Sequence, residues 1–372
     1  QDLCRNQVPE WAGDELQGVR CHFPGKADAG ETLLQPSSEM AAESGQLLLT
    51  ATDLQVHFPI QRGVFKRTVG YVKAVDGVSF LLAAGRTLAL VGESGCGKTT
   101  AGKALLRLIE PTAGEVEYAG VNLSTLDKPA MRAVRSDMQI IFQDPYASLN
   151  PRMLVGDIIE EGMKALGVIT DPAVRKQRVD ELLERVGLPA SSALRYPHEF
   201  SGGQRQRISI ARALAVEPKL IVCDEPTSAL DVSVQAQVLN LLKELQDDLG
   251  LAYLFITHDL SVVEYLAHDI AVMYLGRIVE SGPAAEILDN PEHPYTQALL
   301  AAIPKLGVQA AETETVAATV DIPSPSNPPA GCHFHPRCPK ALEQCRVQYP
   351  ATTVLEHGHR VACHLSSRTA IK

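Results

Sequence analysis

A glycine-rich stretch, GESGCGKT at residues 92–99, constrains the fold of this chain more than any other feature. It fits the pattern G-x-x-x-x-G-K-[ST]. The apolar run Arg86–Val91 precedes it and a helical pattern follows, which is the context that the pattern requires. Glycines let the backbone wrap tightly, so its N–H groups converge on phosphates, and the following helix adds its positive N-terminus. The stretch therefore predicts a phosphate-binding loop between a buried strand and a helix.

The side chains at the end of this loop predict how a nucleotide is held. Lys98 should reach the β- and γ-phosphates, and the Thr99 hydroxyl should hold Mg²⁺. We therefore expect ATP and Mg²⁺ as cofactors. The expected nucleotide-binding residues of this segment are Gly92, Glu93, Ser94, Gly95, Cys96, Gly97, Lys98, Thr99 and Thr100.

A second motif lies at residues 220–225, where an apolar strand pattern ends in two acids. Taken alone, the two acids could be a solvated strand end. Beside a phosphate loop, Asp224 can hold Mg²⁺, often through water, and Glu225 is positioned to polarise the attacking water. The two motifs together predict a site that hydrolyses a nucleotide.

Apolar runs alternate with helical patterns such as Ser233–Asp248, which predicts an α/β fold with a mostly parallel sheet. Residues Asp157–Ala193 show helical patterns without a strand, so we expect a helical insert at about 150–198. Beside Arg86–Val91, the expected strands are Met138–Phe142, Lys219–Asp224, Ala252–Thr257 and the shorter Val78–Leu82.

The two ends of the chain resemble each other. Cys4 begins a CRNQVP segment that is followed by Cys21, and Cys345 begins a CRVQYP segment that is followed by Cys363. A chance match is the alternative to our interpretation, which is that the chain continues an upstream copy of the same module. The expected divisions are 1–24 (tail fragment of an upstream cysteine-rich module), 25–46 (linker), 47–303 (ATPase domain), 304–330 (linker) and 331–372 (cysteine-rich tail).

The stretch FSGGQRQR at residues 200–207 resembles the signature sequence of ABC ATPases. In that family the signature binds the γ-phosphate held by the other subunit's loop, so two ATP molecules lie at a dimer interface. The helical pattern Gly203–Ala215 agrees with this role, because a helix N-terminus with bare glycines binds anions. The resemblance implies that Ser201, Gly202, Gly203 and Gln204 complete the partner's ATP site.

Other motifs of the same family occur in order. Gln143 resembles the glutamine that touches Mg²⁺ and the attacking water, and the SALD segment ending at Asp231 resembles the loop that crosses the dimer. His258 resembles the histidine that contacts the γ-phosphate. The resemblance implies that Glu225, His258 and Gln143 are catalytic, and that Thr99, Gln143 and Asp224 hold Mg²⁺.

The adenine-binding aromatic and two arginines are assigned with alternatives. An aromatic face that stacks on adenine is expected, and Tyr71 is the first candidate with Phe58 as the second. Arg205 and Arg207 follow the signature, where we expect a solvated helix face; a contact with the partner subunit is the alternative.

Longer segments at 143–151, 195–200 and 293–296 resemble the ATPases of dipeptide and oligopeptide importers, whose relatives carry nickel or glutathione. The resemblance covers about residues 47–372. It implies a P-loop ABC ATPase core whose mostly parallel sheet has antiparallel edge strands, with a helical insert and a small cysteine-rich C-terminal domain.

Four of the eight cysteines lie in the last part of the chain: Cys332, Cys338, Cys345 and Cys363. The N-terminus does not look like a signal peptide, so disulfides are not expected, and clustered cysteines of this kind more often hold metal. In many members of the family this tail resembles a domain that binds a [4Fe–4S] cluster. The spacing lacks C-x2-C pairs, which favours the cluster over zinc; four unliganded thiols are the third possibility. The nearby histidines, expected around the site rather than as ligands, are His333, His335 and His364.

The resemblance implies that ATP hydrolysis powers the import of dipeptides or oligopeptides at the cytoplasmic face of the inner membrane. The expected partners are a second ATPase module, tandem-fused or heterodimeric, two transmembrane permeases and an extracytoplasmic binding protein. A net charge of −10 argues against nucleic acid, and no apolar run has the ~18 residues of a membrane-spanning helix. The alternatives are glutathione or nickel import, an ABC ATPase acting on ribosomes or DNA, and a redox sensor that gates the ATPase through the cluster.

Overall fold

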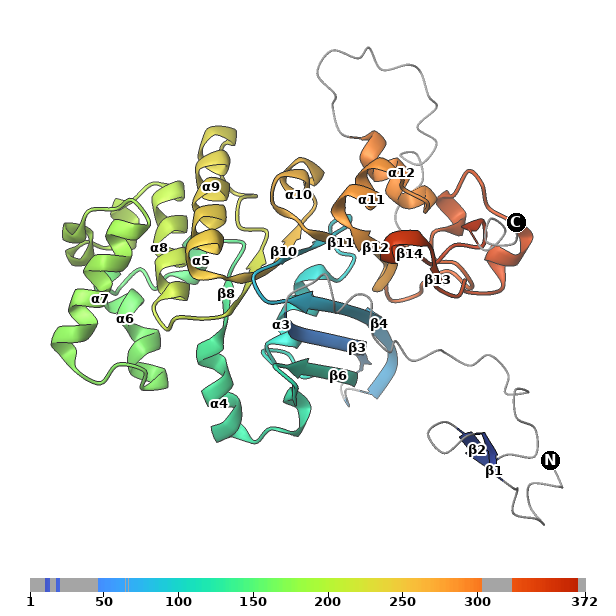
Figure 1. Cartoon of the computed structure of the whole chain (residues 1–372), viewed down its shortest axis with the longest axis horizontal. Helices are drawn as coiled ribbons and strands as arrows, with labels where there is room; N and C mark the ends of the chain where they lie inside the picture. The colour runs from blue at the N-terminus through green and yellow to red at the C-terminus, as the bar shows by residue number, and fades with distance from the viewer. Residues whose placement is uncertain are drawn as a thin grey trace. The chain divides into compact units, whose positions relative to one another are not determined.

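The computed structural model describes residues 11–13, 18–20, 46–63, 65, 67–302 and 323–366 (Figure 1). Contacts divide the chain into a unit of residues 1–38 and a unit of residues 39–372. In the first unit, strands β1 (Trp11–Gly13) and β2 (Gly18–Arg20) form an antiparallel pair. Cys4, Cys21 and most of the two expected linkers lie outside the described residues.

The larger unit is built on an eight-stranded sheet with the order β13-β14-β12-β11-β5-β10-β9-β8. The five strands from β11 to β8 are parallel, whereas β12, β14 and β13 are antiparallel at one edge. This confirms the predicted mostly parallel sheet with antiparallel edge strands. The strands are β5 (Thr87–Val91), β8 (Met138–Ile141), β9 (Leu220–Asp224), β10 (Ala252–Thr257), β11 (Asp269–Tyr274), β12 (Arg277–Pro283), β13 (Thr353–Val354) and β14 (Arg360–Val361).

The parallel arrangement of the strands places the predicted site residues together. Every residue of β5, β9 and β10 is buried, as their continuous apolar sequences require. Gly92 follows β5, Glu225 follows β9 and His258 follows β10, while Gln143 comes two residues after β8. Since parallel strands end at the same edge of a sheet, these residues meet along the edge where α/β folds bind ligands.

A second, antiparallel sheet has the order β4-β3-β6-β7. The sequence predicts antiparallel strands only at the edges of one sheet, so this separate sheet is a difference from the expectation. Its buried side chains, such as Leu49 and Val78, share an apolar cluster with the helix after β5. The strands are β3 (Leu47–Arg62), β4 (Arg67–Ala83), β6 (Ala113–Tyr118) and β7 (Val121–Asn122).

Helices complete the unit, and α6, α7 and α8 gather at the left end of Figure 1. The predicted helix Ser233–Asp248 is α9, and the predicted signature helix is α8. No helix in the described part of the chain is long and apolar enough to cross a membrane. The helices are α3 (Lys98–Leu105), α4 (Lys128–Asp137), α5 (Pro145–Ser148), α6 (Val155–Leu166), α7 (Pro172–Arg185), α8 (Gly202–Leu214), α9 (Val232–Leu249), α10 (Leu260–Leu266), α11 (Ala284–Asp289) and α12 (Pro294–Ala301).

The cysteine-rich segment, residues 323–366, packs into the larger unit. Its strand β14 pairs with β12, and its Phe334 is buried against Tyr274 and Tyr295. The expectation of a separate small domain here is not confirmed. A segment of this size buries little apolar surface alone, so it shares the core of its neighbours.

Candidate active site

The phosphate loop joins β5 to α3 and is shaped by two close backbone approaches. A Cβ atom on Gly97 would lie 1.9 Å from the carbonyl oxygen of Ala74 in β4, and φ at Gly97 is +108°. A Cβ atom on Gly92 would lie 2.2 Å from the carbonyl oxygen of Met273 in β11. Only glycine fits at these two positions, so β4 and β11 hold the loop tightly wound.

The Lys98 side chain lies across this loop and is 4% exposed. Its Nζ donates hydrogen bonds to the carbonyl oxygens of Gly92, at 2.7 Å, and Glu93, at 3.0 Å. The ammonium group is therefore fixed where phosphates would meet the loop. Of the other predicted loop residues, Ser94 and Gly95 are exposed, Cys96 is buried, and Thr100 lies in the first turn of α3.

Thr99 and Asp224 meet at a candidate Mg²⁺ site. The Thr99 hydroxyl donates a 2.7 Å hydrogen bond to Oδ1 of Asp224. Burial raises the pKa of the Asp224 carboxyl, so the ionised carboxylate is destabilised there unless a cation offsets its charge. A carboxylate and a hydroxyl are hard oxygen ligands, so the two side chains fit Mg²⁺.

Glu225 lies at the centre of a second group of side chains. Nε2 of Gln143 donates a 2.9 Å hydrogen bond to Oε2 of Glu225, and Nδ1 of His258 lies 3.3 Å from Oε1. The backbone of Glu225 is left-handed, with φ of 45°, which is uncommon outside glycine and concentrates at functional sites. Its N–H donates a hydrogen bond to the carbonyl oxygen of Ile256, which holds this strained turn in place and thereby fixes the position of the carboxylate.

Gln143, Glu225 and His258 line one open cavity of about 710 Å³, whereas Lys98, Thr99 and Asp224 are not among its lining residues. The cavity brings together the phosphate loop and the predicted catalytic residues from three different strand ends. Its lining residues are Gly92, Glu93, Ser94, Gln143, Asp144, Glu225, Ser228, Ala229, His258 and Leu299.

The predicted signature residues lie on another element and do not line this cavity. Ser201 caps α8: its Oγ accepts a hydrogen bond from the N–H of Gln204, whose side chain accepts one from the N–H of Ser201. A Cβ atom on Gly203 would lie 2.3 Å from Cγ1 of Val234, so α9 packs closely against this turn. The turn presents exposed Ser201 and Gln204 at a helix N-terminus.

Arg205 and Arg207 differ from the expectation of a solvated helix face. Arg205 donates to the carbonyl oxygen of Pro197, and its guanidinium lies 3.9 Å from the ring centroid of Tyr146. Arg207 donates to the carbonyl oxygen of Val186. The expectation is wrong because the end of α7, at Val186, and the 3₁₀ turn before α8, at Pro197, offer carbonyl oxygens to the two side chains.

Three other predicted residues do not line the cavity. Asp231 caps α9 by accepting a hydrogen bond from the N–H of Val234, and it does not line the cavity. Tyr71 and Phe58 lie on the paired strands β4 and β3 and are 53% and 40% exposed. The structure thus leaves both aromatic faces accessible.

Sequence reasoning missed two residues that hold the phosphate loop. The N–H of Glu93 donates a 2.9 Å hydrogen bond to the hydroxyl of Tyr295, and the Glu93 carboxylate pairs with Arg337. Tyr295 belongs to the HPYT segment, whose resemblance to importer ATPases was the only available signal. Arg337 lies beside Cys338, and no pattern in the sequence relates it to the loop.

The four cysteines of the tail form one neighbourhood of free thiols. Burial, and then the three other thiols, raise the pKa of Cys332 to about 11. The sulfur of Cys345 accepts a 3.4 Å hydrogen bond from the N–H of Leu342. Burial also raises the pKa of the Cys338 and Cys363 thiols, so their thiolates need a cation beside them, and thiolates are the ligands that iron–sulfur clusters and zinc take.

The His, Cys, Asp and Glu side chains of the described residues do not form a site for a metal ion. Across residues 46–302 and 323–366, no three His, Cys, Asp or Glu side chains are placed to hold one ion. Tetrahedral zinc requires its sulfurs about 2.3 Å from a common centre.

Residues 75–228 match the family model described as ABC transporter, and residues 279–345 match the model described as oligopeptide/dipeptide transporter, C-terminal region. The oligopeptide transport ATP-binding protein AppF of Bacillus subtilis (strain 168) is 51% identical over 330 residues, covering 88% of this chain and 100% of that protein. The dipeptide transport ATP-binding protein DppF of Haemophilus influenzae is 51% identical over 316 residues, covering 85% and 96%. A solved dimeric ATP-binding cassette, in a post-hydrolysis state bound to ADP and Pi, matches with a TM-score of 0.57 and 26% identity, covering 64% of this chain and 99% of that one.

Proposed function

Because this chain belongs to the family of ATP-binding proteins of oligopeptide and dipeptide ABC transporters, we propose that it hydrolyses ATP to power the import of dipeptides or longer peptides. It works as one of two paired ATPase modules at the cytoplasmic face of the membrane. The observation that carries the proposal is the convergence of Gln143 and His258 on the Glu225 carboxylate beside the phosphate loop.

The chemistry follows from the charges around the cavity. Lys98 and the loop N–H groups bind the β- and γ-phosphates, while Thr99 and Asp224 would hold Mg²⁺, with Gln143 as a further ligand. The ion, when bound, neutralises charge on the phosphates. Glu225 accepts a proton from the attacking water, and His258 stabilises charge that develops on the γ-phosphate.

One chain supplies two half-sites in this proposal. Its loop binds one ATP, while Ser201, Gly202, Gly203 and Gln204 contact the ATP held by the partner module. Their exposed place at the N-terminus of α8, an element apart from the phosphate loop, supports this assignment, and Asp231, which caps α9, belongs to the same dimer face. The partner is a second ATPase module, tandem-fused or separate.

Adenine would lie against the antiparallel sheet. Ala74 touches the phosphate loop through its carbonyl oxygen, and Tyr71 precedes it by three residues, about 10 Å along an extended strand. Tyr71 is therefore our first candidate for stacking, and Phe58 on the neighbouring strand is the second.

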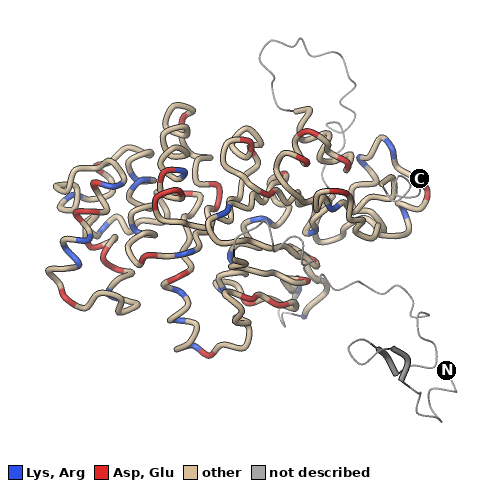
Figure 2. Tube along the Cα trace, viewed as in Figure 1, with Lys and Arg blue, Asp and Glu red and all other residues tan. Residues whose placement is uncertain are grey.

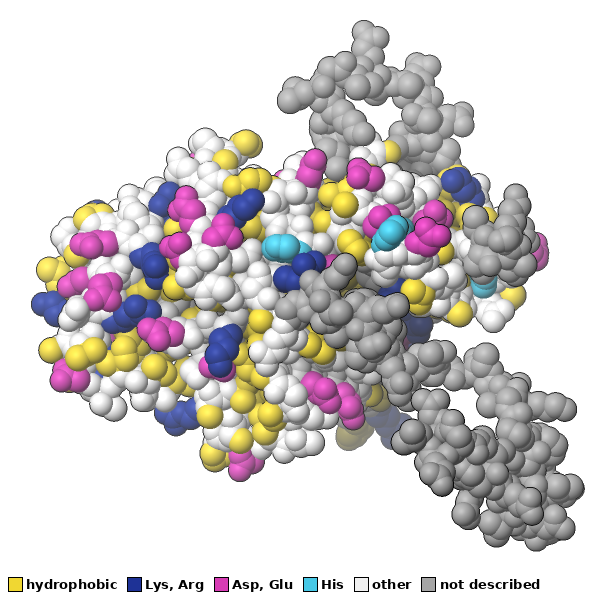
Figure 3. All heavy atoms as spheres, viewed as in Figure 1, with side chains coloured by type: hydrophobic (Ala, Val, Ile, Leu, Met, Phe, Trp, Pro, Cys, Tyr) yellow, Lys and Arg dark blue, Asp and Glu magenta, His cyan; other side chains and the backbone are white. Residues whose placement is uncertain are grey.

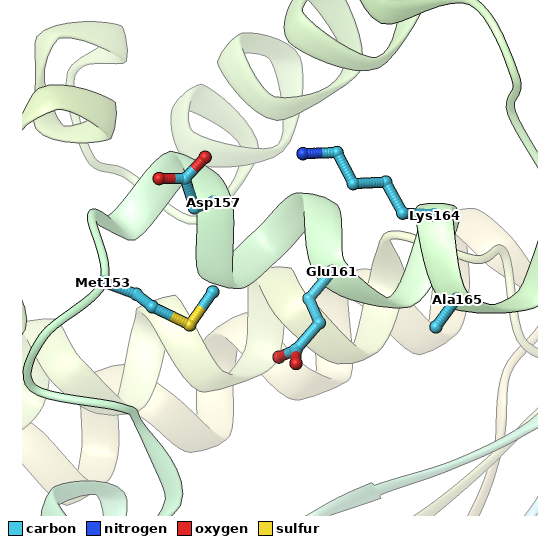
Figure 4. Close-up of a pocket in the computed structure, with 5 residues that line it drawn as sticks. All are labelled: Met153, Asp157, Glu161, Lys164 and Ala165. Atoms are coloured by element: carbon cyan, nitrogen blue, oxygen red, sulfur yellow. The ribbon is translucent and has the colours of Figure 1, made fainter.

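The helical insert carries the features expected of a docking surface for two permeases. Hydrophobic side chains are interspersed with charges on the face of the insert shown in Figure 3. An open pocket of about 400 Å³ lies on α6, from which Asp157, Glu161 and Lys164 project (Figure 4). Met153 and Ala165 complete its lining, so apolar and acidic contacts are both available to a cytoplasmic helix of a permease.

The rival function, an ATPase acting on ribosomes or DNA, calls for basic side chains gathered on one face. Lys and Arg alternate with Asp and Glu along the helical insert in Figure 2. With the net charge of −10, this mixture favours protein partners.

Affinity purification of the tagged chain from its own cells tests the proposed function. We expect two apolar permease subunits and a second ATPase module to co-purify, and a peptide-loaded binding protein to stimulate ATP hydrolysis in the reconstituted complex. Lys98→Ala is the matched control: it should retain the partners but lose hydrolysis. Co-purification of ribosomes without permeases contradicts the proposal, and stimulation by nickel or glutathione instead of peptide would reassign the cargo.

We propose that Cys332, Cys338, Cys345 and Cys363 hold a [4Fe–4S] cluster. The mutual proximity of the four thiols supports a shared metal group, since the other three each raise the pKa of Cys332. The spacing of the cysteines, which lacks C-x2-C pairs, favours a cluster over zinc.

Metal analysis of anaerobically purified protein tests the cluster. We expect about four irons and four sulfides per chain, with a brown absorbance that is lost in Cys345→Ala. One zinc per chain instead of iron would show that the cysteines form a zinc site, and the absence of both iron and zinc would show that they are four unliganded thiols. Cys223→Ala, a buried cysteine of β9, is the control that should retain iron.

A further inference from the structure

An ion pair joins the cysteine-rich segment directly to the phosphate loop. Nη1 of Arg337 lies 2.7 Å from Oε2 of Glu93, and Nη2 lies 2.8 Å from Oε1. The two hydrogen bonds are parallel and bidentate, which is the strongest and most directional arrangement that a guanidinium makes with a carboxylate. The two residues are 244 positions apart in the chain.

Water has little access to the guanidinium of this pair. The Arg337 side chain is 7% exposed and the Glu93 side chain 26%. The guanidinium also lies 5.8 Å from the ring centroids of Tyr274 and Phe334. Because the guanidinium is poorly hydrated, loss of the Glu93 carboxylate leaves its charge poorly compensated, and loss of Arg337 frees the Glu93 side chain to turn toward the cavity.

The position of Glu93 determines where the Lys98 ammonium lies. Its carbonyl oxygen accepts a hydrogen bond from Nζ of Lys98, and its N–H donates to the Tyr295 hydroxyl. The carboxylate is held by Arg337, so the side chain, the N–H and the carbonyl group of this one loop residue are all fixed. Displacing Glu93 therefore moves the Lys98 ammonium as well.

At the other end, Arg337 is positioned by the cysteine-rich segment. It closes a 3₁₀ turn, His335–Arg337, between Cys332 and Cys338, and its N–H donates to the carbonyl oxygen of Phe334. The turn is bonded to both flanking cysteines, because the N–H of His335 donates to the carbonyl oxygen of Cys332 and the N–H of Cys338 donates to that of His335. The N–H of Cys332 donates in its turn to the carbonyl oxygen of Cys345.

We propose that Arg337 is a positioning residue for the phosphate loop, so that the order of the cysteine-rich segment sets the affinity of this module for ATP. Coupling between two sites is reciprocal, so ATP binding also orders the segment. The inference rests on the proposed function in one respect, that residues 92–99 bind ATP.

The test uses the purified full-length chain and a fluorescent ATP analogue with Mg²⁺. Arg337→Gln should raise the dissociation constant about tenfold, within the range typical of coupled sites. Glu93→Gln should raise it by a similar factor, and the double variant should bind no more weakly than either single variant. Lys340→Gln removes another contact of the segment, to Gln297 of α12, and should bind like the unchanged protein.

A second readout separates positioning from a merely structural role. In the unchanged protein, the ATP analogue should slow amide hydrogen exchange in residues 332–345, and Glu93→Gln, which alters no residue of the segment, should remove this effect. If Arg337→Gln does not fold, Arg337→Lys is used instead. Lysine keeps the charge but cannot make the two parallel hydrogen bonds, so this variant should bind the ATP analogue with an affinity between those of the unchanged protein and Glu93→Gln. Unchanged affinity in Glu93→Gln and in the folded Arg337 variant overturns the inference, whereas failure of the unchanged protein to bind the analogue refutes the proposed ATP site instead.

Discussion

Glu225→Gln should lower ATP turnover by about 10²- to 10⁴-fold, the usual contribution of a general base, while nucleotide binding persists. The amide keeps the size of the side chain and a contact with Gln143, but it cannot accept a proton from water. ATP then remains uncleaved between two modules. We therefore expect a closed ATP-bound dimer, measured by size-exclusion chromatography and by single-turnover hydrolysis.

Glu264→Gln is the control for this substitution. Glu264 is an exposed carboxylate on α10, outside the cavity, so its amide variant should turn over ATP at the normal rate. Normal turnover in Glu225→Gln would refute the role assigned to Glu225.

Gly97→Ala should destroy the phosphate loop. The new Cβ would lie 1.9 Å from the carbonyl oxygen of Ala74, an overlap that neither backbone can relieve without displacing β4. Left-handed backbone costs about 1–2 kcal/mol for alanine, and the overlap adds about 1–3 kcal/mol to the loss in free energy of unfolding. We expect loss of ATP-analogue binding and a lower denaturation midpoint in urea.

Gly95→Ala separates the effect of backbone strain from the effect of steric overlap with β4. Gly95 belongs to the same loop and has φ of +80°, but no atom lies within 4 Å of its added Cβ. Without nucleotide, this variant should lose only the stability expected from strain. Equal destabilisation by the two substitutions would show that the approach of β4 does not restrict the loop.

Much of the site was predictable because its residues occupy local patterns. The glycine spacing before Lys98 and the two acids after an apolar run are signals that span fewer than ten residues. The parallel strands then bring Glu225 and His258 to one edge of the sheet, as a parallel α/β fold requires. The expectation failed for Arg205 and Arg207, since their partners are the carbonyl oxygens of Pro197, in a 3₁₀ turn before α8, and of Val186, at the end of α7, and no local pattern relates either to the two arginines.

By itself, the sequence determined the phosphate loop, the buried strands around it and the family, because each depends on residues that are neighbours along the chain. Only the tertiary structure decided what holds that loop in place. Ala74, Met273 and Tyr295 approach it from three other elements, and Arg337 reaches it across 244 positions. Such contacts follow from the order of strands in the sheet and from where the cysteine-rich segment packs, and local periodicity carries no information about either.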